Sequence, residues 1–84
     1  MREVQVNVTE KHIKNGIRFN ARNCPLALAI RDCGFNQVGI GAFTFYIDGE
    51  SGNLPEDMIK FRQNYDNKNE VFPTTFKLIL RKDH

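Results

Sequence analysis

The stretch that decides the fold is Asn23-Cys24-Pro25-Leu26-Ala27-Leu28-Ala29-Ile30-Arg31-Asp32-Cys33-Gly34. Proline is favoured at the first position of a helix, so Pro25 predicts a helix start with Asn23 or Cys24 as the cap. The apolar residues that follow recur at the i, i+3, i+4, i+7 spacing of an amphipathic helix, and they are Leu26, Ala29, Ile30 and Cys33. A glycine then ends the pattern. We therefore predict the main helix over residues 25–33, with one face in the core.

Strict alternation of apolar and polar residues predicts a strand at each end of the chain. The first run is Val4-Gln5-Val6-Asn7-Val8, and the second is Phe76-Lys77-Leu78-Ile79-Leu80. A period of two residues places one side chain in the core and the next in solvent. We expect these strands to cover about residues 2–8 and 75–81.

Two further helices are indicated by their boundary residues. A short helix over 10–15 would begin after Thr9, a good N-cap, and end before Gly16. At under two turns it needs tertiary contacts to be stable. A third helix opens at Pro55, followed by two acids in its first turn, where the macrodipole favours negative charge.

The middle of the chain predicts two strands, at about 37–40 and 43–48. Its apolar residues are broken near Gly39 and Gly41, which indicates a hairpin or a bulge. The segments Asp48-Gly49 and Ser51-Gly52-Asn53 have the composition of turns, and we expect both to be turns.

These elements predict a single α+β domain over residues 1–84. The order is strand–helix–helix–strand–strand–helix–strand, which favours a small, mostly antiparallel four-stranded sheet with helices on one face. The residues expected in the core are Leu26, Ala29, Ile30, Phe45, Ile47, Phe61, Phe76 and Leu78.

Charge is distributed unevenly along the chain. Residues 11–31 contain five Lys or Arg and no acid, whereas residues 32–57 contain five acids and no base. The net charge is only +2, which does not favour bulk nucleic-acid binding. Opposite charges on neighbouring segments would suit a bipolar partner or head-to-tail self-association. The candidate partner surface consists of Lys11, His12, Lys14 and Arg31.

The loop that leads into the main helix is the candidate ligand site. A helix N-terminus offers free backbone N–H groups, and Arg18 and Arg22 stand beside the predicted one. Arginine for phosphate, an aromatic ring for stacking and an amide for base edges would suit a nucleotide. The candidate ligand-binding residues are Arg18, Asn20, Arg22, Asn23 and Cys24. The alternative is a solvated basic loop in which Phe19 is buried as a plug.

The sequence offers little support for catalysis, metal binding or a cofactor. Cys24 at a helix start could carry a reactive thiol, and we expect it to label faster than Cys33, but nothing places the internal histidine, His12, beside it as a base. The cysteines and histidines lack metal-site spacing, and no phosphate-binding glycine motif is followed by the required lysine and helix. We therefore expect no catalytic residues, no metal site and no cofactor.

The composition also predicts where the protein resides. No stretch approaches the ~20 apolar residues that a bilayer span requires, and the N-terminus does not resemble a signal peptide. Two cysteines nine residues apart on one helix are too distant for a disulfide. Unpaired thiols favour a reducing, cytoplasmic setting.

Several short motifs together resemble a known family. They are Val4-Gln5-Val6-Asn7-Val8-Thr9, His12-Ile13 with Gly16 and Arg18, Asn23-Cys24-Pro25-Leu26-Ala27-Leu28-Ala29, Leu54-Pro55-Glu56, Phe61 with Tyr65-Asp66, and Pro73-Thr74-Thr75-Phe76-Lys77-Leu78. In this order and spacing the chain resembles a family of small proteins encoded by tailed bacteriophages and prophages. Members tend to carry glycine where this chain has Phe19. The resemblance implies a bacterial cytoplasm during phage infection, and it implies no particular activity.

Taken together, these features predict a non-enzymatic binding protein that antagonises a host process such as antiviral defence. In the first mechanism it captures a small anionic, nucleotide-like ligand at the basic loop and helix start. In the second it binds a host protein directly, with its charge polarity steering the encounter. A small nucleic-acid-binding module is a weaker third alternative, because the acidic segment balances the basic one.

Overall fold

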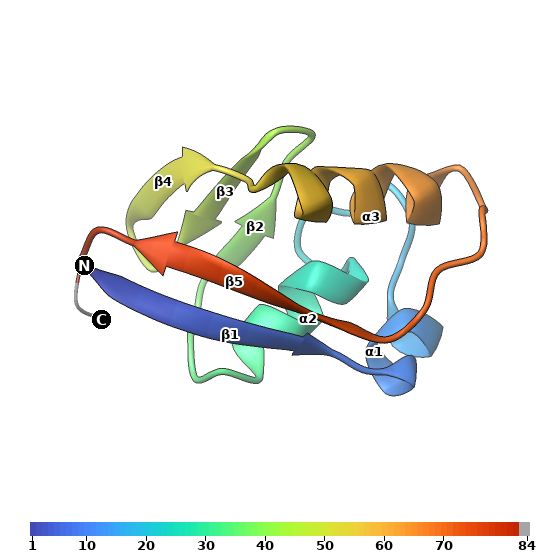
Figure 1. Cartoon of the computed structure of the whole chain (residues 1–84), viewed down its shortest axis with the longest axis horizontal. Coiled ribbons are helices and arrows are strands. Elements are labelled where there is room, and N and C mark those ends of the chain that lie inside the picture. Colours follow the sequence, from blue (N-terminus) through green and yellow to red (C-terminus); the bar gives the residue numbers. More distant parts are fainter. Residues whose placement is uncertain (83–84) are drawn as a thin grey trace.

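The structure is a computed structural model that describes residues 1–82, and it shows a small α+β domain (Figure 1). Within that range the elements are β1 (Arg2–Val8), α1 (Glu10–Asn15), α2 (Pro25–Arg31), β2 (Val38–Ile40), β3 (Thr44–Ile47), β4 (Glu50–Asn53), α3 (Glu56–Asp66) and β5 (Thr74–Leu80). Antiparallel strands combined with three helices confirm the predicted α+β class, whereas the predicted order of elements lacks β4.

The strands form two sheets, so the prediction of one four-stranded sheet is wrong. β1 pairs with β5, and Val4 lies opposite Leu78 in that pair. β2, β3 and β4 form a separate three-stranded sheet in that order. Figure 1 shows the three-stranded sheet beside one end of the β1–β5 pair. The sequence could not distinguish one sheet from two, because alternation fixes which face is buried and leaves the pairing partner open.

Strand β4 occupies the segment that we expected to be a turn, so that prediction is wrong. The true turn is Asp48-Gly49, whose two residues have φ of 44° and 91°. Positive φ at both central residues is typical of a type I′ hairpin turn, whose twist matches that of the strands it joins. In the returning strand, Gly52 lies opposite Phe45, and a Cβ atom there would be 2.7 Å from the ring. Glycine therefore lets the ring pack over the strand.

A buried carboxylate links the two sheets. Glu50 in β4 is only 6% exposed. Its carboxylate accepts hydrogen bonds from the backbone N–H groups of Arg81 (2.7 Å) and Lys82 (2.9 Å), just after β5. Hydrogen bonds to a charged acceptor are among the stronger ones in proteins. The end of β5 is thereby fixed to β4.

Helix α2 packs between the sheets and carries much of the core. It contacts both β1 and β2, and Ile30 has no exposed surface. It ends at Arg31, two residues before the predicted boundary. On α3, the Phe61 ring meets Phe76 of β5 edge to face at 5.6 Å. All of the predicted core residues are buried, which confirms this prediction: Leu26, Ala29, Ile30, Phe45, Ile47, Phe61, Phe76 and Leu78.

Helix α1 is held by its cap and by contacts with distant residues. The Thr9 backbone N–H donates to Nδ1 of His12 (3.0 Å), while the His12 backbone N–H donates to the Thr9 hydroxyl (3.4 Å), forming a capping box. The Tyr65 hydroxyl lies 2.8 Å from the Gly16 carbonyl oxygen, to which it can donate. A Cβ atom on Gly16 would be 2.6 Å from the Pro25 ring. Glycine therefore lets the chain pass closely over the start of α2.

Candidate functional site

The loop of residues 17–23 between α1 and α2 is closed by its own hydrogen bonds. The Ile17 N–H donates to the Asn23 carbonyl (2.8 Å), and the Cys24 N–H donates to the Asn20 carbonyl (3.1 Å). The Asn20 side-chain oxygen accepts from the N–H groups of Arg22 (3.1 Å) and Asn23 (3.0 Å). The predicted site residue Asn20 thus organises the loop from within.

Arg18 lies against the end of α3. Its Nε donates to the Tyr65 carbonyl oxygen at 3.0 Å, and its guanidinium carbon lies 5.1 Å from the centre of the Tyr65 ring. A cation beside the last carbonyl groups of a helix is favourable, and stacking over an aromatic face adds to it. This arrangement attaches the loop to α3. The Arg18 side chain therefore does not line the groove that contains Arg22.

The start of α2 is enclosed by the protein. Cys24 is only 1% exposed, and Pro25 is also buried. Burial raises the pKa of the Cys24 thiol above its ordinary value, and the nearby backbone N–H of Ala27 offsets this only in part. The expectation that Cys24 is the accessible thiol is therefore wrong, because the loop folds over the helix start. Cys33, near the other end of the helix, is partly exposed.

We expect a maleimide reagent to label Cys33 faster than Cys24 in the folded protein. Burial and the neighbouring Asp32 raise the pKa of the Cys33 thiol above its ordinary value of 9.0. Because the thiolate is the reacting form, labelling of Cys33 should accelerate as the pH rises toward the raised pKa of its thiol. Peptide mapping by mass spectrometry over time gives both rates, and equal labelling in denaturant is the control. Equal rates in the folded protein would contradict the burial of Cys24.

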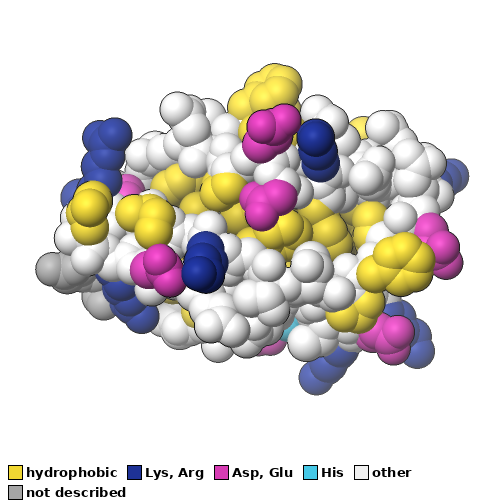
Figure 2. All heavy atoms as spheres, viewed as in Figure 1, with side chains coloured by type: hydrophobic (Ala, Val, Ile, Leu, Met, Phe, Trp, Pro, Cys, Tyr) yellow, Lys and Arg dark blue, Asp and Glu magenta, His cyan; other side chains and the backbone are white. Residues whose placement is uncertain are grey.

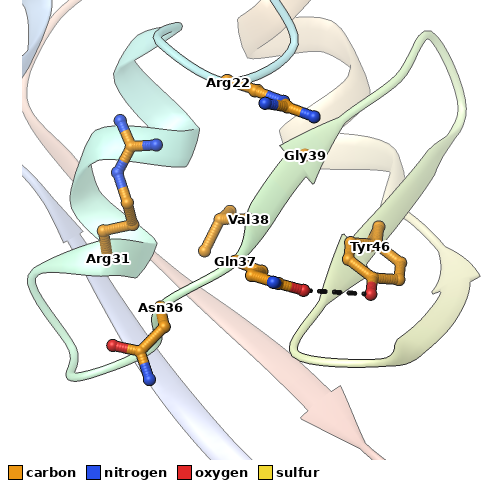
Figure 3. Close-up of a pocket in the computed structure, with 7 residues that line it drawn as sticks. All are labelled: Arg22, Arg31, Asn36, Gln37, Val38, Gly39 and Tyr46. Atoms are coloured by element: carbon orange, nitrogen blue, oxygen red, sulfur yellow. Dashed lines mark hydrogen bonds between the residues drawn. The ribbon is translucent and has the colours of Figure 1, made fainter.

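Arg22 and Arg31 line one groove, which has a volume of about 400 Å³ (Figure 3). The loop contributes Arg22, α2 contributes Arg31, and the opposite wall comes from β2, β3 and the residues just before β2. The full lining consists of Arg22, Arg31, Asn36, Gln37, Val38, Gly39 and Tyr46. The size lies within the usual range for small-molecule sites.

The groove is electropositive. Arg31 donates from Nη2 to the side-chain oxygen of Asn23 at 3.1 Å. Across residues 1–82, neither Arg22 nor Arg31 forms an ion pair with a carboxylate, and no acidic residue lines the groove. Two guanidinium groups sharing a hollow repel each other unless an anion lies between them. This arrangement can bind a phosphate or carboxylate group.

The opposite wall is polar and held in place. The Asp48 carboxylate accepts from the backbone N–H groups of Asn36 (3.1 Å) and Gln37 (2.6 Å). The Tyr46 hydroxyl donates to the Gln37 side-chain oxygen at 3.3 Å (Figure 3). Tyr46 stays 43% exposed. An aromatic ring and two amide side chains are therefore available on this wall for stacking and hydrogen bonding.

A second hollow brings together part of the predicted partner surface. Its lining includes Lys11, His12 and Arg31, so Arg31 lies between the groove and this second hollow. His12 itself is engaged, because its Nδ1 accepts from Thr9 and its Nε2 can therefore donate to Asp32. Lys14, the fourth predicted residue, lines a different hollow next to β5.

The residues of the opposite wall were not predicted as site residues, and they are Asn36, Gln37, Val38, Gly39 and Tyr46. They lie in the acidic segment, away from the basic loop along the chain. One signal was available. Tyr46 alternates with the core residues Phe45 and Ile47, which places an aromatic ring on the outer face of β3.

No family model, curated protein or solved structure matches this chain. In residues 1–82 no group of three or more His, Cys, Asp or Glu side chains could hold a metal ion. Over the same residues, none of the helices has the length and apolar character needed to cross a bilayer.

Proposed function

We propose that this protein is a non-enzymatic binding protein that captures a small anionic, nucleotide-like ligand in the groove between the loop and β2. The observation that carries the proposal is the pair of guanidinium groups, Arg22 and Arg31, which share the groove without a carboxylate partner among residues 1–82. Charge-assisted, bidentate hydrogen bonds from arginine suit a phosphate group.

The groove supplies a partner for each part of a nucleotide. Arg22 and Arg31 would hold the phosphate, Tyr46 would stack on the base, and the amide of Gln37 would contact a base edge. In this proposal Asn20 accepts a hydrogen bond from the backbone of Arg22, and Asn23 holds Arg31. The other two predicted site residues, Arg18 and Cys24, do not line the groove. The ligand thus binds beside the basic loop and away from the enclosed start of α2.

The resemblance to phage-encoded proteins gives the proposal its biological setting. A protein that sequesters a nucleotide in the cytoplasm of an infected bacterium would deprive a host defence system of its signal. Direct binding of a host protein and binding of a nucleic acid are the alternatives, and they would leave the affinity for free nucleotides negligible.

Titration calorimetry with nucleoside 5′-monophosphates tests the proposal. Because a hydrogen bond to a charged group contributes about 1.5–3 kcal/mol, we expect Arg22→Ala or Arg31→Ala to weaken binding by roughly ten- to a hundredfold. Arg22→Lys should be nearly as harmful, since lysine cannot replace a bidentate contact. Arg81→Ala is the matched control, because Arg81 lies after β5 and does not line the groove.

The proposal is overturned if the wild-type protein binds none of these nucleotides at millimolar concentration. It is also overturned if the Arg22 and Arg31 variants bind as tightly as Arg81→Ala.

A further inference from the structure

Phe19, at the tip of the loop, has a conformation that its sequence alone does not favour. Its side chain is 74% exposed, and its φ is +57°. A bulky side chain is rare in this left-handed region, because its Cβ atom crowds the following carbonyl group. The alternative in which Phe19 is buried as a plug is therefore wrong, and the aromatic ring is exposed to solvent on a strained backbone.

The strained backbone of Phe19 is held by an ion pair between Asp66 and Arg62. The Phe19 N–H donates to Oδ1 of Asp66 at 3.0 Å, and Oδ2 of Asp66 accepts from Nε of Arg62 at 3.3 Å. Arg62 also donates to the Gly41 carbonyl at 3.0 Å. Both charged side chains are largely enclosed, being 11% and 13% exposed. Helix α3 and the β2–β3 turn therefore fix the position of an exposed ring.

Such an arrangement is typical of a binding contact. Residues with strained backbones persist only where contacts with the surrounding structure fix their conformation, and they cluster at functional sites. An exposed aromatic side chain whose backbone is already ordered loses little entropy on docking, and aromatic residues often dominate interfaces. Arg18 directly precedes Phe19 in the chain and is exposed, so a complementary surface would be apolar with acidic residues at its rim.

The chain itself carries a hollow of that kind, between α1 and the segment that precedes β5. Its volume is about 350 Å³. Ile13, Val71, Phe72 and Pro73 form its apolar lining, with two acids and one base, Glu10, Glu70 and Lys14, around them. Figure 2 shows hydrophobic side chains with acidic ones on both sides at the end of the molecule where the α3–β5 connection lies. We call it the acid-rimmed hollow.

We propose that the protein self-associates, with Phe19 of one copy inserted into the acid-rimmed hollow of a second copy. Charge complementarity supports this choice of partner, because the exposed Arg18, which directly precedes Phe19, would face Glu10 and Glu70 at the rim. Phe72 in the hollow is itself 66% exposed, so both surfaces lose apolar area from water on docking. The proposal is independent of the ligand groove and does not rely on nucleotide binding.

Phe19 and the acid-rimmed hollow come from different segments, so each copy offers one Phe19 ring and one hollow. Such a contact can be tested in halves, because a copy without Phe19 keeps its hollow and a copy with a blocked hollow keeps Phe19.

Sedimentation velocity over a wide range of protein concentrations tests the proposal. The wild-type protein should have a mass that rises above that of the monomer. Phe19→Gly should raise the dissociation constant at least about tenfold, as expected for an interface hot spot. Glycine tolerates positive φ, so the denaturation midpoint of this variant should be unchanged or higher, which separates loss of association from loss of folding.

The half-site experiment makes the test specific. Val71→Arg blocks the hollow, and Glu70→Lys reverses the charge at its rim. Each should be monomeric alone, whereas a mixture of Phe19→Gly and Val71→Arg should form a one-to-one pair and no larger species. Ile79→Thr, which removes an exposed aliphatic side chain from the outer face of β5, should associate like the wild type.

Three results would overturn the proposal. A wild-type protein that stays monomeric up to millimolar concentration excludes self-association. Unchanged association of Phe19→Gly excludes this anchor. If both single variants are monomeric but do not pair when mixed, the ring and the hollow do not bind each other.

Discussion

Replacing Arg62 with methionine should lower the free energy of unfolding by about 3–5 kcal/mol, the range expected when one partner of a buried ion pair is removed. The Arg62 side chain lies 3.3 Å from Asp66, and both are largely enclosed. Methionine fills similar space but leaves the Asp66 carboxylate without its counter-charge and the Gly41 carbonyl without its donor. The loss is a large share of the about 5–15 kcal/mol that typically stabilises a domain.

Helix α3 contains a matched control for this substitution. Lys60 and Glu56 form another i, i+4 pair on the same helix, at 3.6 Å, but their side chains are 70% and 83% exposed. Exposed helical pairs contribute only about 0.3–0.5 kcal/mol, so Lys60→Met should hardly change the denaturation midpoint. Urea titrations of both variants give the comparison. Equal, small effects would show that burial does not strengthen the Arg62–Asp66 pair.

The double variant Arg62→Met with Asp66→Leu adds a second test. Removing both charges avoids an unpaired carboxylate, so it should be less destabilised than Arg62→Met alone. The Phe19 N–H loses its acceptor in this variant, but it lies at the surface, where water can replace it. In this double variant we therefore expect the loop conformation to change more than the global stability does.

The parts of the fold that the sequence predicts well are those with strong local periodicity. β1 was predicted at the residues where it occurs, and α2 was correct to within two residues at its end. In both, one face is buried, and the spacing of apolar residues reports that burial directly. The core residues followed from the same spacing, and all of them are buried.

Strand β4 escaped prediction because its sequence does not have the period of a strand. In Glu50-Ser51-Gly52-Asn53 the one buried residue is a glutamate, whose carboxylate binds backbone groups beyond β5. The partner is 31 residues away along the chain, so no local pattern could reveal it. The Asp48-Gly49 pair was the available signal, since a type I′ turn requires a returning strand.

The groove illustrates the same limit for a site. Its basic wall comes from residues that share one acid-free segment, and charge patterning singled that segment out. Its second wall comes from β2 and β3. The packing of α2 against β2 and a hydrogen bond from the Ile40 N–H to the Ala21 carbonyl (2.8 Å) bring the walls together. The left-handed backbone of Phe19 depends likewise on Asp66, which is 47 residues away. The apolar character of Phe19 alone would predict that its ring is buried.

Replacing Ile30 with alanine should lower the free energy of unfolding by about 2–5 kcal/mol, since burial is lost and a cavity forms. Ile30 has no exposed surface, and it lies on α2 among core residues of both sheets. The matched control is Leu28→Ala, on the same helix and with the same helix propensity change to within a few tenths of a kcal/mol. Leu28 is only partly buried and lines the second hollow, so its loss should be clearly smaller.

Urea denaturation of the two variants, followed by circular dichroism, measures the difference. The midpoint should fall much further for Ile30→Ala than for Leu28→Ala, while the slope stays unchanged in both. A cavity at Ile30 would loosen the packing of α2 against both sheets. The groove depends on this packing, because its two arginines lie on the wall formed by α2 and the loop, and its second wall is formed by β2 and β3. Nucleotide affinity should therefore fall in Ile30→Ala before the protein unfolds globally. An unchanged midpoint would mean that α2 presents a different face to the core.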